Sequence, residues 1–332
     1  MMSADARGGV RAERQFKEFL EFIEFSRLSF RSYIASLIAV ALALLAAPAR
    51  AQIPGPPLGM TGTIRFHGGF PSRFIASRNV EVWLPPGYER DANARYPVIY
   101  MHDGQNVFDP ATSFFGVDWG VDETMTRLVE ERRVRPAIVV AVWNTPARLA
   151  EYLPRKMLAS EHDVPSGIPN VPPVPGPVLS DAYLRFLVEE LKPFVDHTYR
   201  TLTGPDDTFV MGSSMGGLVS AYAVTEFPQV FGAAACLSTH WTAADGAMVD
   251  YLGHALPKPG AHRFYFDHGT RTLDSLYAPF QQRVDSIARA AGYVEGRDFV
   301  SRVFDGAEHS EVAWRARVAE PLVFLLGAPG RR

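Results

Sequence analysis

Short runs of apolar residues, each bounded by polar or turn-forming residues, recur along most of the chain. Continuous apolar runs are typical of strands that are buried on both faces of a parallel sheet. Five such runs lie at residues 96–101, 136–143, 233–237, 263–266 and 299–304. A sixth begins at Thr208 and leads into a turn rich in small residues. Before them, residues 61–66 and 79–84 also favour strands, and the second alternates as a half-buried edge strand does.

Between these runs, apolar residues return every three or four positions, which is the spacing of an amphipathic helix. This spacing predicts helices at residues 121–131, 277–291 and 312–326, and another directly after the turn. Ser180 is expected to cap a further helix, which Pro193 should kink or end. Because strands and helices alternate, we expect an α/β fold with a mostly parallel central sheet flanked by helices on both faces.

The beginning of the chain departs from this pattern. Residues 33–47 form an apolar run after two arginines, and Ala49-Arg50-Ala51 has the A-x-A form of a cleavage site. The run is short for a membrane span and lacks a stop-transfer flank, although a retained membrane anchor is the alternative. The sequence therefore predicts a signal peptide with a long n-region over residues 1–51, cleaved after Ala51. A single secreted or periplasmic domain would then cover residues 52–332.

A second break lies at residues 164–178, which contain six prolines and show neither helical nor strand spacing. We interpret this segment as a proline-rich insertion loop of polyproline character. Loops of this length in a domain are often functional, so it either rims the site or is a neutral surface insertion.

Charge and composition narrow the classes of function. Without residues 1–51, the chain keeps 26 Lys and Arg against 31 Asp and Glu, a net charge of −5. This acidic balance disfavours nucleic acid as a partner. Cys236 is the only cysteine, so no intramolecular disulfide can form. Because no His-Glu-x-x-His, Cys-x-x-Cys or P-loop motif occurs, we expect no cofactor and no metal site.

The turn after Thr208 contains the pattern Gly-x-Ser-x-Gly, formed by Gly212, Ser214 and Gly216. An apolar strand precedes it and an amphipathic helix follows, which is the context of a nucleophile elbow. Such a turn is expected to need glycines on both flanks because it is tight. It would present the Ser214 hydroxyl at the start of a helix, where negative charge is stabilised. The alternative is a glycine-rich turn without chemistry.

A serine hydroxyl needs a base, and the base needs a carboxylate that orients it. In the chain order serine, acid, histidine, the base follows the last strand, and His309 is the only histidine there. The acid should follow the preceding strand, which leaves Asp274 and Asp267 as candidates. We favour Asp274, because Asp267 stands at the strand end, where an aspartate often only caps a turn.

Two backbone N–H groups are needed to stabilise an oxyanion, and we assign them to Met215, after the serine, and to Gln105. Gln105 lies in the loop that follows the strand at residues 96–101. Four more residues near the expected carboxyl ends of strands are candidates for substrate binding, or else pack in the core or rim of the site: Trp143, Tyr152, His240 and Trp241.

These residues resemble the putative-esterase group of α/β-hydrolases, which includes enterochelin-esterase-like, feruloyl-esterase-like and S-formylglutathione-hydrolase-like proteins. The resemblance rests on residues 100–109, 143–145, 151–152, 199–201, 212–217 and 238–241. It implies an α/β-hydrolase fold, a serine triad, carboxylic-ester substrates and no cofactor. Many members have a shorter Gly-x-x-Asp where this chain has Gly269, Thr270 and Asp274, so both candidate acids stay open.

The sequence thus predicts a secreted serine esterase that forms an acyl-enzyme on a small-molecule or carbohydrate-linked ester. An acyltransferase would use the same triad, with an alcohol instead of water as the acceptor. A non-catalytic binding protein on a hydrolase scaffold is a further alternative, although the candidate serine, acid and histidine are all present. The pattern predicts no particular oligomeric state.

Overall fold

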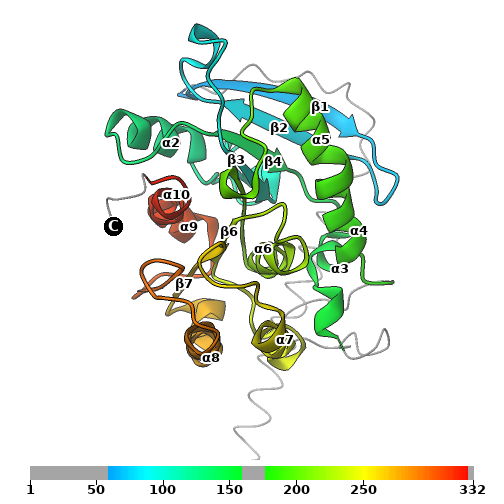
Figure 1. Cartoon of the computed structure of the whole chain (residues 1–332), viewed down its shortest axis with the longest axis vertical. Coiled ribbons are helices and arrows are strands. Elements are labelled where there is room, and N and C mark those ends of the chain that lie inside the picture. The colour runs from blue at the N-terminus through cyan, green and yellow to red at the C-terminus, as the bar shows by residue number, and fades with distance from the viewer. Residues whose placement is uncertain (1–58, 159–175, 328–332) are drawn as a thin grey trace, which may run out of the picture. The chain divides into compact units, whose positions relative to one another are not determined.

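A sheet of eight strands forms the centre of the part of the chain that the structure, a computed structural model, describes (Figure 1). The described residues are 59–158 and 176–327, so the predicted signal peptide and residues 164–175 of the predicted proline-rich loop lie outside them. The strands, in chain order, are β1 (Thr63–Phe70), β2 (Arg78–Leu84), β3 (Val98–His102), β4 (Ile138–Val142), β5 (Thr208–Ser213), β6 (Ala233–Leu237), β7 (Arg263–Gly269) and β8 (Phe299–Phe304).

Their spatial order is β1-β2-β4-β3-β5-β6-β7-β8. The first two pairs, β1 with β2 and β2 with β4, are antiparallel, and all later pairs are parallel. Each of the six continuous apolar runs forms one of the six strands β3 to β8. The prediction of a mostly parallel sheet is therefore confirmed.

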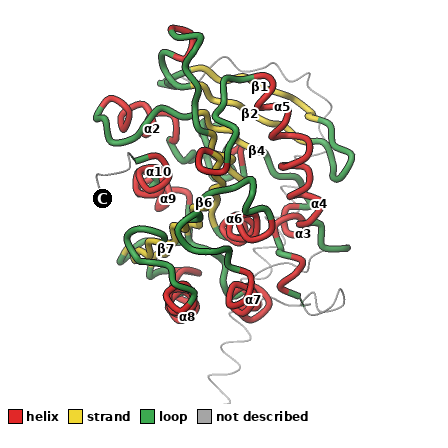
Figure 2. Tube along the Cα trace, in the orientation of Figure 1, coloured by secondary structure: helices red, strands yellow, loops and turns green. Residues whose placement is uncertain are grey.

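Helices cover both faces of this sheet, as the sequence predicts (Figures 1 and 2). One face packs against α2 (Val121–Glu130), α9 (Glu311–Arg317) and α10 (Ala319–Leu326). The other packs against α3 (Arg148–Tyr152), α4 (Ser180–Arg185), α5 (Lys192–Thr198), α6 (Met215–Glu226), α7 (Ala247–Ala255) and α8 (Ala278–Ala290). Successive strand residues point to opposite faces, so Val98 and Tyr100 join one core and Ile99 and Met101 the other.

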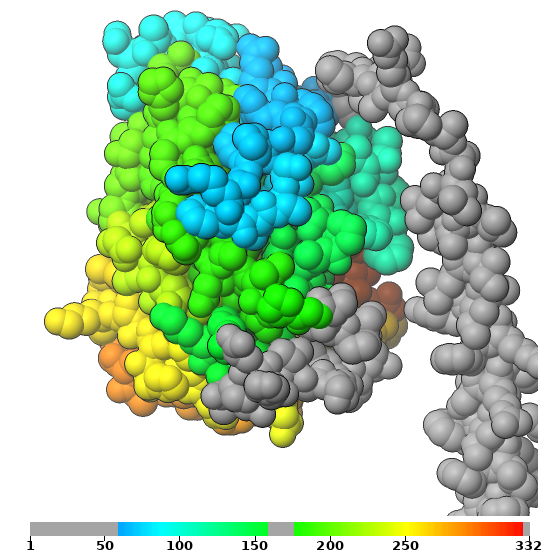
Figure 3. Space-filling view, turned by 90° about the vertical axis from the view of Figure 1, so that its right-hand side faces the viewer, coloured from blue at the N-terminus to red at the C-terminus, as the bar shows by residue number. Residues whose placement is uncertain are grey.

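The expectation that residues 79–84 form an edge strand is wrong, because β1 pairs with one side of β2 and β4 with the other. Trp83 on β2 is fully buried and donates its indole N–H to the Thr61 carbonyl at 2.6 Å. β1 is the actual edge. His67 packs edge-on against Phe194 of α5, and its Nε2 lies 2.7 Å from the hydroxyl of Tyr199, which follows α5. Figure 3 shows the blue surface of this part of the chain next to green surface.

The helix predicted to start at Ser180 is longer than expected and passes Pro193. A π-helical segment, Phe186–Leu191, joins α4 to α5 without a break, and Pro193, the second residue of α5, follows this wider turn directly. Ser180 is the first helical residue instead of the cap, and its hydroxyl accepts the Arg155 N–H at 2.9 Å. The predicted closing helix divides into α9 and α10 at Val318.

Short 3-10 helices complete the connections, at Tyr88–Arg90, Gly104–Asn106, Arg155–Met157, Pro205–Asp207, Ala243–Gly246 and Thr272–Leu276. The second and the last of these follow β3 and β7 and bring polar groups to the carboxyl edge of the sheet. In open α/β sheets, ligands bind at this edge.

Candidate active site

Ser214 lies between the end of β5 and the start of α6, with φ of 56° and ψ of −122°. This backbone region is strained for a residue with a side chain and is found where a site needs it. A Cβ on Gly212 would lie 2.8 Å from the carbonyl carbon and oxygen of Gly216, and a Cβ on Gly217 would lie 2.8 Å from Thr239 Oγ1. A Cβ on Gly216 would meet only ordinary contacts at 3.5 Å. The turn therefore requires glycine at position 212, before the serine, as expected. The expectation that it also requires glycine at position 216 is wrong, because a Cβ fits there.

A cavity of about 240 Å³ opens beside the turn and is lined by both Ser214 and His309. His309 follows β8 in a loop, and its N–H donates to Thr272 Oγ1 at 2.8 Å. Its ring packs edge-on against Trp314, with centroids 5.0 Å apart. These contacts fix the imidazole in the wall of the cavity that Ser214 also lines.

Asp274 contacts the His309 imidazole, and the distance from Asp274 Oδ1 to His309 Nδ1 is 2.6 Å. The other carboxylate oxygen accepts the Ser238 hydroxyl at 2.6 Å and the Gly269 N–H at 2.5 Å. Burial alone would raise the pKa of Asp274, but the hydrogen bonds from His309 and Ser238 outweigh it and hold the pKa below its usual value. The carboxylate therefore stays ionised and leaves His309 Nε2 free to face a substrate.

The other candidate acid, Asp267, lies at the end of β7 with its side chain fully buried. It pairs with Arg317, whose Nη2 lies 3.0 Å from Asp267 Oδ1, and it also accepts the Ser238 N–H and the Tyr265 hydroxyl. Burial raises the pKa of Asp267, and Arg317 opposes that rise. No hydrogen bond joins Asp267 to His309 within the described residues, so the structure brings Asp274 and not Asp267 to the histidine.

The two predicted oxyanion donors lie in the turns that follow β5 and β3. Within residues 59–158 and 176–327, the N–H groups of Met215 and Gln105 have no protein acceptor. The Gln105 turn sits tightly on β4, because a Cβ on Gly104 would lie 2.5 Å from the Ala141 backbone. Gln105 itself is buried, and its side-chain oxygen accepts the Asn144 N–H at 3.2 Å.

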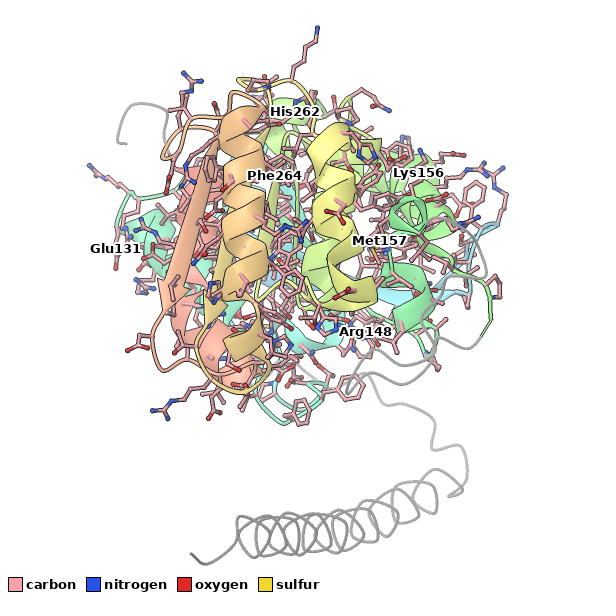
Figure 4. The ribbon with its side chains drawn as sticks, turned by 90° about the horizontal axis from the view of Figure 1, so that it is seen from below. Glu131, Arg148, Lys156, Met157, His262 and Phe264 are labelled. Carbon is pink, nitrogen blue, oxygen red and sulfur yellow. The ribbon has the colours of Figure 1, made fainter. Side chains whose placement is uncertain are left out.

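Asp103 precedes this turn in a left-handed conformation, with φ of 56°. Its carboxylate accepts two hydrogen bonds from Arg148, at 2.6 and 2.7 Å, and one from the Asn144 side chain at 2.6 Å. Burial would raise the pKa of Asp103, but Arg148 and Asn144 lower it overall. Figure 4 shows Arg148 at the opposite end of the fold from His262, which precedes β7, so Arg148 lies where the parallel strands end. This ion pair holds in place the turn that carries Gln105, the predicted oxyanion donor.

None of the four candidates for substrate binding is among the residues that line the cavity. Tyr152 and Trp241 are buried, and Tyr152 accepts the Asp103 N–H at 3.3 Å. His240 donates its backbone N–H to the Ser214 carbonyl at 3.2 Å, and burial lowers its pKa to about 4. Trp143 donates to Glu81 near β2. These contacts favour the alternative given for the four residues, namely that they pack in the core or rim of the site.

Sequence reasoning missed the side chains that do line the cavity beside Ser214: Asn106, Phe114, Phe115, Asn144, Arg148, Glu311 and Trp314. Three signals were present. Phe114 and Phe115 are adjacent aromatic residues shortly after the oxyanion turn, Glu311 and Trp314 closely follow His309, and Arg148 follows β4.

Among the described residues, no three or more His, Cys, Asp or Glu side chains are grouped so that they could hold a metal ion. In the same part of the chain, every helix is too short or too polar to span a membrane.

Comparisons with known proteins agree with the predicted resemblance to the putative esterases. The model of a family described as "putative esterase" matches residues 72–325. An uncharacterised Bacillus subtilis (strain 168) protein, YbbA, is 21% identical over 213 residues, which cover 61% of this chain and 72% of that protein.

Two solved structures share the fold. The ferulic acid esterase AmCE1/Fae1A from Anaeromyces mucronatus has a TM-score of 0.55 and 19% identity, over 84% of this chain and 94% of that one. The enterobactin esterase FES from Shigella flexneri has a TM-score of 0.56 and 18% identity, over 85% of this chain but only 63% of that one. At this identity the likeness concerns the fold alone, and it confirms the predicted α/β-hydrolase fold.

Proposed function

The chain belongs to the putative esterase family and is a serine esterase that hydrolyses carboxylic esters, and we propose that Ser214, His309 and Asp274 are its catalytic triad. The observation that carries this proposal is the 2.6 Å contact between Asp274 Oδ1 and His309 Nδ1, beside a cavity that Ser214 and His309 share. The strained backbone of Ser214 supports it, because such strain is kept where a side chain must be presented.

In the first half-reaction, the Ser214 hydroxyl oxygen attacks the ester carbonyl while His309 Nε2 accepts its proton. Asp274 keeps the imidazole in the tautomer that has its proton on Nδ1, and stabilises the imidazolium that forms. The carbonyl oxygen becomes an oxyanion, which accepts hydrogen bonds from the Met215 and Gln105 N–H groups. Both groups lack another protein acceptor among the described residues, so neither must give up a bond to do this.

The first half-reaction ends when this tetrahedral intermediate collapses, the bond from the carbonyl carbon to the alcohol oxygen breaks, and His309 returns the proton to the leaving alcohol. An acyl group then remains on Ser214 as an ester. In the second half-reaction, water enters beside His309, loses a proton to Nε2 and attacks the acyl carbonyl, and the same donors stabilise the second oxyanion. This intermediate collapses, the bond to the Ser214 oxygen breaks, and His309 returns the proton to Ser214 as the carboxylic acid leaves. The Asp103–Arg148 pair takes no part in these steps but fixes the Gln105 turn.

The substrate is a small-molecule or carbohydrate-linked ester. The two solved structures are a ferulic acid esterase and an enterobactin esterase, and this supports an organic ester as the substrate. The cavity beside Ser214, of about 240 Å³, is the proposed binding place for the ester. We also propose that the domain is exported, on the strength of the apolar run and the Ala49-Arg50-Ala51 site.

A pre-steady-state burst tests the acyl-enzyme. With p-nitrophenyl acetate, rapid mixing should release one equivalent of p-nitrophenol per chain before a slower steady rate, because this activated ester acylates Ser214 faster than water removes the acyl group. His309→Ala should remove the burst. The proposed mechanism would be excluded if p-nitrophenol release showed no burst with p-nitrophenyl acetate and with p-nitrophenyl esters of longer acyl chains, and if His309→Ala turned these esters over as fast as wild type.

A further inference from the structure

The cavity beside Ser214 holds a carboxylate that forms no ion pair with any of the described residues. Glu311, the first residue of α9, is only 8% exposed and lines the cavity. Within residues 59–158 and 176–327, its side chain has no ion pair and no hydrogen bond to another side chain. Burial and the charge of Asp103 raise the pKa of Glu311, while a hydrogen bond from its own backbone N–H and the charges of His309 and Arg148 act in the opposite direction. A carboxylate in such a place is stabilised by a positively charged ligand.

The positive charge of Arg148 does not meet this need. Its Nε and Nη2 atoms both donate to Asp103, and Asn144 donates to the same carboxylate. No salt bridge joins Arg148 to Glu311 among the described residues. Because the Asp103–Arg148 pair is neutral as a unit, the lining side chains carry a net negative charge when Glu311 is ionised and His309 is neutral.

Two aromatic side chains on the same cavity remain open to solvent. Phe114 is 68% exposed and Phe115 is 76% exposed, and both line the cavity. Their ring centroids are 6.3 Å apart. The loop that carries them is anchored, because the Phe114 N–H donates to the Asn106 side chain at 3.1 Å and Thr112 donates to the Gln105 carbonyl at 2.7 Å. Exposed aromatic faces attract organic cations through the ring quadrupole.

We propose that Glu311, Phe114 and Phe115 form a binding site for an organic ammonium group, so that the enzyme prefers esters that carry a quaternary or protonated amine. This inference rests on the proposed function only in that the ammonium group belongs to the ester. Glu311 supplies the countercharge from the buried wall, and the two rings contact the carbon atoms around the nitrogen. Neutral esters still enter the cavity, but without this attraction.

A pair of ligands with the same shape tests the charge preference. Choline and 3,3-dimethylbutan-1-ol differ in that a charged nitrogen replaces a neutral carbon. Their dissociation constants are measured by ligand-observed NMR with the full-length protein, which needs no turnover. Wild type should bind choline about tenfold more tightly, as expected for one unpaired charge at a partly desolvated site. In Glu311→Gln, the ratio should fall to nearly one.

Glu308→Gln is the matched control, because Glu308 is exposed, precedes His309 by one position and does not line the cavity. It should keep the tenfold preference. Phe114→Leu/Phe115→Leu keeps apolar contacts but removes the rings, and it should weaken choline binding several-fold more than binding of the neutral alcohol. Because both phenylalanines are exposed, this variant tests the site even when Glu311→Gln does not fold.

The outcomes separate the two proposals. Equal affinities in wild type, or a preference that survives Glu311→Gln, would overturn the ammonium site and leave the esterase mechanism intact. A preference for choline that depends on Glu311, in a protein whose ester turnover does not depend on Ser214, would support the ammonium site and overturn the mechanism. Adding salt should reduce the choline preference, because an electrostatic attraction at an open cavity is screened.

Discussion

Replacing each of the two candidate acids with asparagine separates catalysis from stability. Asp274→Asn places an amide against His309 Nδ1, which then loses its carboxylate partner at 2.6 Å. Without that partner, the imidazole adopts the wrong tautomer and its cation is not stabilised, so kcat should fall by about 10³ to 10⁴. With its NH2 group toward His309, the amide keeps its oxygen toward the Ser238 hydroxyl and the Gly269 N–H, and a neutral oxygen accepts these hydrogen bonds more weakly than a carboxylate does, so the loss of folding stability should be roughly 1–3 kcal/mol.

Asp267→Asn should give the opposite pattern. It removes the charge that pairs with Arg317, and both side chains are nearly inaccessible, at 0% and 3% exposure. Among the described residues, Arg317 would then keep its hydrogen bond to the Ser238 hydroxyl but have only one carboxylate nearby, that of Asp274 at 3.9 Å. Breaking a buried ion pair from one side costs roughly 3–5 kcal/mol of folding stability. The kcat of the folded fraction should change by less than about tenfold, because Asp267 does not contact His309.

Urea unfolding followed by circular dichroism gives the stability, and steady-state hydrolysis of p-nitrophenyl acetate gives kcat. Both are measured on the same preparations below the unfolding transition. If Asp267→Asn lost activity by 10³ while Asp274→Asn kept it, the assignment of the acid from geometry would be refuted.

Three further predictions concern stability and processing. Burial lowers the pKa of His102 and of His240 to about 4, below the value near 6.5 expected when unfolded, so the unfolded state binds more protons between these values. The free energy of unfolding should fall by roughly 2 kcal/mol per histidine from pH 7 to pH 5. In urea titrations, His102→Asn should remove about half of the combined fall from the two histidines, and a pH dependence equal to that of wild type would contradict this prediction. Gly212→Ala should cost about 1–3 kcal/mol because of the backbone contact at 2.8 Å, whereas Gly216→Ala should cost less than about 1 kcal/mol, and equal losses would contradict the geometry. Sequencing of the protein exported by its native host should begin at Gln52, and full-length protein found only in the cytoplasm would exclude export.

The sheet was predictable because its central strands are continuous apolar runs with helices between them. The helices α3 and α7 were not predicted, since each is short and lies among turns. The edge position of residues 79–84 was misjudged because alternation reports how much of each face is buried and not how many neighbours a strand has. The neighbour on the outer side, β1, has an exposed pattern of its own.

The triad residues could be proposed from chain order, because the order of strands in this fold determines where a base and an acid follow. The lining of the cavity could not. Trp143 and Tyr152 stand near strand ends, but the turn at Gln105 packs over β4 and Tyr152 lies beneath Asp103. Phe114 and Phe115 lie in a loop without periodicity, so their position beside Ser214 depends on tertiary structure alone.

The most direct test of the central claim is covalent labelling of the nucleophile. A fluorophosphonate probe should add one group per chain, and peptide mass spectrometry should map it to Ser214. Ser214→Ala should lose both labelling and ester turnover while keeping its fold, since removal of one hydroxyl at a turn costs little stability. Ser213→Ala, a change of the same residue type one position away, should keep the label. Label on another serine, or near-normal turnover in Ser214→Ala, would contradict the account.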